Sequence, residues 1–323
     1  MKFDFAPMEG ITGYTYRNAH KSHFIGIDRY YTPFLVANQN LKLKNKERND
    51  IAPMHNQDIH IIPQILSNKA GECLWAIKEC HQLGYDEVNI NLGCPSPTVV
   101  TKGKGAGMLK DLDQLDMFLD ELFTLLHLDI KVSIKTRIGV EDDSQAERLI
   151  SIFNKYPISE LIIHPRVQKD FYKKPVHLDT FEKMLKKSKH PVTYNGNILD
   201  EEDYHQFIER FPEVERIMLG RGMISNPAFA RELLTHESLT KEEFLSFHHD
   251  LLSGYQERIG GDKNVLFKMK ELWYYFETLF YVDKKSLKAV RKAKTCKDYK
   301  EAVEQLVSSC AINNELHKDM HFR

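Results

Sequence analysis

The sequence predicts a (β/α)8 barrel, a closed ring of parallel strands each followed by a helix, and a small helical bundle after it. Eight short β-rich runs alternate with helical stretches over roughly the first 235 residues, the count and length of such a barrel. The turn after the first run, Ala6-Pro7-Met8-Glu9-Gly10, lacks the glycine-rich fingerprint of a doubly wound dinucleotide-binding sheet. These two observations favour the barrel.

The expected strands are, in chain order, Lys2–Phe5, Arg29–Tyr31, His60–Ile65, Glu87–Leu92, Lys131–Thr136, Glu160–His164, Pro191–Asn195 and Glu215–Leu219. Amphipathic stretches between them predict helices over Glu72–Leu83, Leu112–Leu126, Asp143–Lys155 and Asp200–Arg210.

The pattern changes near residue 236. From Glu237 onward there is no β-rich run and no proline, and apolar residues such as Phe244, Phe247 and Leu251 recur at helical spacing. This predicts three or four helices, with Gly260-Gly261 in a loop between two of them. We therefore assign residues 1–235 to the barrel and residues 236–323 to a helical domain.

Composition excludes several classes of protein. The 45 Lys and Arg residues balance 46 Asp and Glu residues, so the formal charge of −1 excludes a globally basic nucleic-acid-binding protein. No apolar run reaches the roughly 20 residues of a membrane span, and the start has no signal-peptide core. Five cysteines without a Cys-x-x-Cys pair favour reduced thiols in the cytoplasm. We expect no membrane association, no metal, no protein partner and a monomer.

The neutral total hides an uneven distribution. The segment Lys284–Lys300, here called the basic segment, has eight basic residues against one acid, a local net charge of +7. A solvated helix face and a surface for nucleic-acid phosphates both explain such a run. A smaller cluster, Lys42, Lys44, Lys46 and Arg48, follows the second strand in an apparent long loop.

Polar residues collect at the ends of seven of the eight strands, where this fold places its active site. In chain order they are Pro7-Met8-Glu9, Gln64, then Asn89, Asn91 and Cys94, then Lys135 and Arg137, then His164 and Arg166, then Asn195-Gly196-Asn197, and finally Gly220-Arg221-Gly222. A single polar strand end is commonly structural. Convergence from so many strands predicts an active site at one mouth of the barrel.

Three features of this mouth indicate its chemistry. Barrels commonly bind a phosphate through the loops after strands seven and eight, where this chain has small residues and the charge of Arg221. A lysine at position 135 would be a fixed positive charge, which suits an anionic reduced flavin ring. A cysteine at position 94, followed by the glycine-rich stretch Lys102–Gly107, is placed to act as a proton donor or a nucleophile.

These residues resemble the tRNA-dihydrouridine synthase family, flavoenzymes that reduce a uridine in tRNA, over essentially the whole chain. The motifs that carry the resemblance are Ala6-Pro7-Met8-Glu9-Gly10, Asn91-Leu92-Gly93-Cys94-Pro95, Lys135-Thr136-Arg137-Ile138-Gly139, His164-Pro165-Arg166, Asn195-Gly196-Asn197 and Leu219-Gly220-Arg221-Gly222. The cysteine motif with the following glycine-rich stretch is the most specific of them.

The resemblance implies a flavin barrel followed by a helical domain that helps to hold tRNA. It implies that FMN is bound by Pro7, Met8, Glu9, Gln64, Asn91, Lys135, His164, Asn195, Gly196, Asn197, Gly220 and Arg221, and that NADPH or NADH reduces it. Cys94 would be the general acid that protonates C5 of the uracil. We expect tRNA contacts at Arg137, Arg166, Lys288, Arg291 and Lys292.

Two other functions fit parts of the sequence. An FMN barrel that acts on a small molecule, similar to dihydroorotate dehydrogenases or ene-reductases, explains the flavin residues but leaves the basic segment without a role. A flavin-free scaffold that binds tRNA explains the basic segment but leaves the polar mouth without a purpose.

Overall fold

A computed structural model describes residues 1–313 of the chain, which form two compact units. The first unit contains Met1–Glu9, Arg29–Asn197 and Pro212–Met218. The second contains Gly10–Asp28, Ile198–Phe211 and the residues from Leu219 onward. The domain boundary expected between residues 235 and 236 stays a prediction, and its last residues, 314–323, lie outside the described residues.

The strands form one parallel sheet of ten short segments. They are β1 (Lys2–Phe5), β2 (Arg29–Tyr31), β3 (Leu35–Val36), β4 (Ile61–Ile62), β5 (Gln64–Leu66), β6 (Glu87–Leu92), β7 (Lys131–Arg137), β8 (Leu161–His164), β9 (Val192–Tyr194) and β10 (Arg216–Leu219). Their order in the sheet is β3-β5-β6-β7-β8-β9-β10-β1-β2-β4.

The order closes into a ring at Pro63. That residue alone separates β4 from β5, so the two segments are halves of one strand that pairs with β2 on one side and with β6 on the other. Proline has no N–H to donate to the ladder, which explains the break in the strand. Counting β2 with β3 and β4 with β5 gives the eight strands that the sequence predicts, and the barrel prediction is confirmed.

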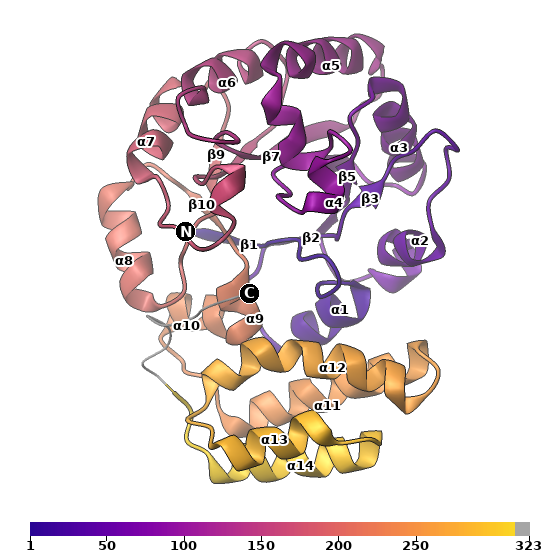
Figure 1. Cartoon of the computed structure of the whole chain (residues 1–323), viewed down its shortest axis with the longest axis vertical. Coiled ribbons are helices and arrows are strands. Elements are labelled where there is room, and N and C mark those ends of the chain that lie inside the picture. The colour runs from indigo at the N-terminus through magenta and orange to yellow at the C-terminus, as the bar shows by residue number, and fades with distance from the viewer. Residues whose placement is uncertain (314–323) are drawn as a thin grey trace. The chain divides into compact units, whose positions relative to one another are not determined.

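The described helices of the first unit lie around the outside of the strands, except for the short α4 (Figure 1). They are α2 (Asn45–Ile51), α3 (Ala70–Gln82), α4 (Pro97–Val100), α5 (Leu112–Leu125), α6 (Ala146–Phe153) and α7 (Leu178–Lys187), with 3-10 turns at η1 (Pro53–His55), η2 (Gly105–Lys110) and η3 (Gln168–Asp170). The prediction of a long loop after the second strand is wrong, because this segment contains β3 and α2. Elements of two and seven residues are too short to show a clear hydrophobic period.

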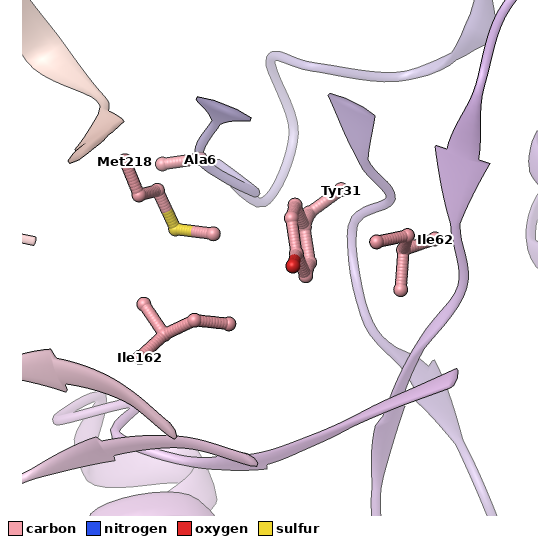
Figure 2. Packing of buried hydrophobic residues seen from close by; sticks show 5 residues of the cluster. All are labelled: Ala6, Tyr31, Ile62, Ile162 and Met218. Atoms are coloured by element: carbon pink, nitrogen blue, oxygen red, sulfur yellow. The ribbon is translucent and has the colours of Figure 1, made fainter. Parts of the chain in front are cut away.

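The barrel interior contains three successive kinds of side chain. Its middle is apolar, and Figure 2 shows the ring of Tyr31 between Met218 and Ile62, with Ala6 and Ile162 completing the cluster. All five residues are buried. Polar residues from the strand ends lie toward the carboxyl ends of the strands, and charged residues from the strand starts lie toward the amino ends.

The charged residues form an ionic layer across the amino ends of five strands and consist of Asp4, Arg29, Glu87, Glu160 and Arg216. Arg29 donates to both carboxylate oxygens of Asp4, at 2.5 and 3.0 Å, and Arg216 donates to the same carboxylate at 2.6 Å. Arg29 also contacts Glu160 at 2.8 Å. Burial alone would lower the pKa of Arg29, but its bond to Asp4 raises that pKa above the ordinary value. The layer stabilises the end of the barrel opposite the mouth.

The second unit is helical, and its described helices are α1 (Tyr14–His23), α8 (Glu201–Arg210), α9 (Arg221–Ser225), α10 (Phe229–Thr235), α11 (Lys241–Arg258), α12 (Asp262–Phe276), α13 (Lys284–Lys292) and α14 (Cys296–Ser309), with a 3-10 turn at η4 (Glu277–Leu279). Four helices, α11 to α14, follow residue 236 in the described chain, as the sequence predicts (Figure 1). Their core contains Phe244, Phe276 and Trp273, whose rings meet edge to face. None of the described helices is long and apolar enough to cross a membrane.

Candidate active site

Cys94 lies just past the end of β6, where Asn91 fixes its backbone. The side-chain Oδ1 of Asn91 accepts hydrogen bonds from the N–H of Gly93 at 3.0 Å and of Cys94 at 2.9 Å. Cys94 is partly exposed, whereas the other four cysteines, Cys73, Cys80, Cys296 and Cys310, are buried. Among the five thiols, Cys94 is therefore the one that a substrate can reach.

The glycine-rich stretch after Cys94 packs directly against it. The N–H of Ala106 donates to the Cys94 carbonyl at 3.0 Å. Gly105 has a φ of +56°, and a Cβ at that position would lie 2.9 Å from the Cys94 carbonyl oxygen. Any other residue would therefore be strained and would push the cysteine out of place.

The Cys94 thiol stays protonated at neutral pH. Burial raises its pKa above the usual range, although a backbone hydrogen bond at Ser96 and the charges of Arg137 and Lys135 act in the opposite direction. A protonated thiol is a proton donor rather than a nucleophile. Of the two roles that the sequence leaves open, the structure favours the donor.

A chain of side-chain hydrogen bonds, here called the amide chain, continues from Asn91 through Gln64 and Asn89 to Ser133. Asn91 Nδ2 donates to Gln64 Oε1 at 2.7 Å, Gln64 Nε2 donates to Asn89 Oδ1 at 2.8 Å, and Asn89 Nδ2 donates to Ser133 Oγ at 3.1 Å. The Ser133 hydroxyl then donates to the Val88 carbonyl at 3.2 Å. Gln64, Asn89 and Ser133 are fully buried.

The direction of the amide chain follows from its first bonds. Backbone N–H groups only donate, so Asn91 must turn its oxygen toward them, and each later amide is then fixed in turn. Gln64 and Asn91 each have a second side-chain N–H beyond those used in the chain. Asn91, which keeps a slight exposure, therefore offers a hydrogen-bond donor, which suits a ligand rich in carbonyl oxygens and ring nitrogens.

Replacing Asn89 with leucine breaks the amide chain at its centre. We expect the free energy of unfolding to fall by about 1–3 kcal/mol, because the Gln64 donor loses its buried acceptor. If Gln64 and Asn91 bind FMN, as the family resemblance implies, its affinity falls as well, since both side chains lose their fixed orientation. Urea denaturation and fluorescence titration with FMN measure the two effects. Ser133→Ala is the matched control, for which we expect a smaller fall in the free energy of unfolding. An unchanged FMN affinity in folded Asn89→Leu would contradict the role of Asn89 in positioning Gln64 and Asn91.

Lys135 is half-buried on β7, and its register partner on β6 is Asn91. Burial and, to a smaller extent, the nearby charge of Arg137 together lower the pKa of Lys135 to about 7, while Cys94 acts in the opposite direction. The ammonium group of Lys135 is poorly hydrated, and no carboxylate is among the groups that shift its pKa. Such a group suits a site that binds a negatively charged ligand.

The lowered pKa predicts a pH-dependent stability. Below pH 7, Lys135 is charged in both the folded and the unfolded chain, so the folded ligand-free protein bears the whole cost of the charge. That cost declines as the pH rises toward the unfolded value of roughly 10. Lys135→Met should therefore raise the melting temperature more at pH 6 than at pH 9. An equal rise at both pH values, measured by differential scanning fluorimetry, would show that water solvates the charge.

Arg137 is completely buried and connects two loops of the mouth. Its guanidinium donates to the carbonyl oxygens of Gly93 at 3.0 Å, Val167 at 2.7 Å and Phe171 at 2.9 Å. It also lies over the ring of Tyr172, 5.4 Å from the centroid. The sequence suggests that Arg137 contacts tRNA. Its bonds to three backbone carbonyls instead favour a structural role, in which it holds the loop that carries Cys94 in place.

Arg166 is also buried, and it organises the end of β8. Its guanidinium donates to the Lys174 carbonyl at 2.6 Å, to Asn197 Oδ1 at 3.1 Å and to His164 Nε2 at 3.2 Å. Arginine cannot accept a hydrogen bond, so His164 Nε2 is the acceptor and the ring proton of neutral His164 sits on Nδ1. Asn195 in turn donates to the Met218 carbonyl at 2.8 Å.

The remaining expected site residues are placed as follows. Pro7 and Met8 follow β1 and are partly exposed, while Glu9 is exposed and pairs with Lys46 at 2.7 Å. Gly196 has a structural reason to be glycine, because a Cβ there would lie 1.9 Å from the Tyr194 hydroxyl. Gly220 and Arg221 lie in the second unit, where α9 begins directly after the last strand.

The structure adds Ser133 and Tyr172 to the residues of the mouth, and it joins Asn89 to Gln64. Tyr172 is exposed and stacks on His164 with the ring centroids 5.9 Å apart. The inward position of Asn89 and Ser133 could have been predicted from the sequence. Side chains alternate along a strand, so Asn89 lies on the same side of its strand as Asn91, and Ser133 on the same side as Lys135. No local pattern marks Tyr172, which lies in an irregular loop.

Comparisons with known proteins place the whole chain in one family. The family model described as dihydrouridine synthase (Dus) matches residues 4–317. A tRNA-dihydrouridine(16) synthase of Aquipseudomonas alcaligenes is 28% identical over 260 residues, which cover 76% of this chain and 79% of that protein. A probable tRNA-dihydrouridine synthase of Staphylococcus aureus (strain Mu50 / ATCC 700699) is 27% identical over 263 residues, covering 79% of this chain and 78% of that protein.

Solved structures support the fold. A variant of NCR from Zymomonas mobilis has a TM-score of 0.51 and 14% identity, covering 76% of this chain and 90% of that one. Morphinone reductase in complex with tetrahydroNAD has a TM-score of 0.51 and 11% identity, covering 76% and 89%. At these identities the likeness shows the fold alone, whereas the family model covers nearly the whole sequence. The chain therefore belongs to the dihydrouridine synthase family.

Proposed function

We propose that this protein reduces the 5,6 double bond of specific uridines in tRNA, with FMN as its cofactor and NADPH or NADH as the electron donor. The observation that carries the proposal is Cys94, a partly exposed thiol that is kept protonated and fixed at the mouth of the barrel. It gains support from membership of the family. We also propose a location in the cytoplasm, where thiols stay reduced.

The donors at the mouth fit a flavin. The second side-chain N–H of Asn91 suits the carbonyls and nitrogens of an isoalloxazine ring, and the family resemblance adds Gln64 and His164 to the residues that bind the flavin. Lys135 supplies the positive charge that an anionic reduced ring requires. By the family resemblance, Asn195, Asn197 and Arg221 are among the residues that bind FMN, and the loops after strands seven and eight commonly bind a phosphate in such barrels.

Cys94 completes the reaction in this proposal. FMN held at this mouth would supply the hydride for C6 of the uracil, once NADPH or NADH had reduced the flavin. Cys94 gives its proton to C5, so that two new C–H bonds replace the double bond and the thiolate then regains a proton from solvent. The uracil has to leave its stack to reach the thiol, as enzymes that modify bases generally require.

The basic segment is the proposed tRNA contact of the helical domain. Its basic residues are all exposed, on α13, on α14 and in the turn between them. Charge reversal at Lys288, Arg291 and Lys292 should weaken tRNA binding and flatten its dependence on salt, because fewer phosphate counterions are released. Filter binding at several salt concentrations measures both effects. An unchanged salt slope would leave the segment as a solvated helix face.

Purified protein tests the proposal directly. We expect a yellow protein with nearly one flavin per chain that forms dihydrouridine in an unmodified tRNA transcript when NADPH is supplied. Relatives named for position 16 make that uridine the first to inspect. A colourless protein that ignores FMN would overturn the proposal. A yellow protein that oxidises NADPH with a small enone but leaves tRNA unchanged would favour the small-molecule reductase instead.

A further inference from the structure

Helix α12 presents two aromatic rings to solvent. Its apolar face is buried through Val265, Met269 and Trp273, while Phe267 and Tyr274 lie on the opposite face. The two are 69% and 63% exposed, more than any other aromatic residue among residues 1–313. They stand seven residues apart, two helical turns, and therefore share one face.

Cations surround these two rings. Lys263 and Lys270 each precede an aromatic residue by four positions and so neighbour it on the helix surface. Arg291 of α13 lies over the Tyr274 ring at 5.5 Å from the centroid. We call Lys263, Phe267, Lys270, Tyr274 and Arg291 the aromatic face.

Three acids, Asp262, Glu271 and Glu277, lie near this face against four cations, Lys263, Lys268, Lys270 and Arg291. Glu277 contacts Arg291 at 2.5 Å, and Glu271 contacts Lys268 at 3.2 Å. The face is therefore positive overall, and it is continuous with the basic segment because Arg291 belongs to both. An apolar protein partner would leave these charges without compensation, whereas a nucleic acid compensates the charges and also supplies rings for stacking.

The spacing of the two rings selects the form of nucleic acid. Seven residues of helix advance about 10 Å, whereas stacked neighbouring bases are only about 3.4 Å apart. The two rings therefore cannot stack on adjacent bases of a duplex or of a stacked strand. They suit two unpaired bases that are splayed out in a loop, with the flanking phosphates near the lysines.

We propose that the aromatic face binds unpaired loop nucleotides of the tRNA substrate, stacking one base on Phe267 and one on Tyr274. The inference rests on the proposed function, since it takes tRNA as the substrate. It assigns to α12 the recognition of RNA shape, and it leaves to the basic segment the sequence-independent attraction to phosphates.

Alanine variants separate stacking from charge. Phe267→Ala and Tyr274→Ala should each weaken tRNA binding roughly tenfold without changing its salt slope, since no charge is removed. Phe267→Trp should retain the affinity. In competition, unpaired RNA should displace tRNA from the wild-type protein better than duplex RNA of the same length, and the double alanine variant should lose that preference.

Met117→Ala is the matched control. Met117 is 71% exposed on α5, next in sequence to Asp116 and near Asp120 and Glu121, so it tests the loss of an exposed apolar side chain in acidic surroundings. We expect unchanged tRNA affinity in that variant. Unchanged affinity in both aromatic variants would overturn the inference, and so would a dimer in sedimentation that the aromatic substitutions dissociate. A wild-type protein that binds FMN but no tRNA would instead refute the proposed function.

Discussion

Cys94→Ala should abolish tRNA reduction while leaving the flavin site intact. We expect the rate of dihydrouridine formation to fall by about 10²- to 10⁴-fold, the usual contribution of a positioned general acid. The amide chain does not use the thiol, since Asn91 binds the backbone N–H of residue 94. FMN content and the rate of NADPH oxidation without tRNA should therefore stay at the wild-type level.

A matched cysteine variant controls for the chemical change itself. Cys80 is buried on α3, and burial raises the pKa of its thiol to about 12, so it takes no part in proton transfer at neutral pH. Cys80→Ala should retain full activity per folded molecule. Wild-type rates in Cys94→Ala, measured by mass spectrometry of digested tRNA, would refute the general-acid role.

Asp4→Ala should cause the largest loss of stability. Asp4 is fully buried and accepts hydrogen bonds from both Arg29 and Arg216. Removal of its carboxylate leaves two guanidinium groups in the ionic layer without their main partner, which costs about 3–5 kcal/mol. Chemical denaturation followed by circular dichroism measures the loss.

Arg148→Ala is the control for an exposed ion pair. Arg148 pairs with Asp113 on the surface of the first unit, and such pairs contribute less than about 1 kcal/mol. If Asp4→Ala cost no more than Arg148→Ala, the ionic layer would have no part in the stability of the barrel.

The sequence predicted the barrel because buried parallel strands and amphipathic helices alternate regularly along the chain. Buried strands such as Glu87–Leu92 and Lys131–Arg137 appear as short runs between amphipathic helices, and their order along the chain is also their order in the ring. The position of Cys94, Lys135 and His164 at strand ends then follows from topology alone.

Side-chain contacts across the barrel could not be predicted in the same way. The amide chain depends on the register that places Gln64 beside Asn89 and Asn91 beside Lys135, and a sequence does not state register. Arg137 illustrates the consequence. Its charge at a strand end suggests a substrate contact, whereas its burial against three carbonyl oxygens is visible only in three dimensions.

A dihydrouridine map of tRNA tests the central claim most directly. The chain would be expressed in a bacterial strain whose tRNA lacks dihydrouridine, so that no other enzyme can form it, and every tRNA position would then be mapped by mass spectrometry. We predict dihydrouridine at a small set of defined uridines with the wild-type chain and none with Cys94→Ala. A blank map with a folded, flavin-loaded wild-type chain, or an identical map with Cys94→Ala, would contradict the account.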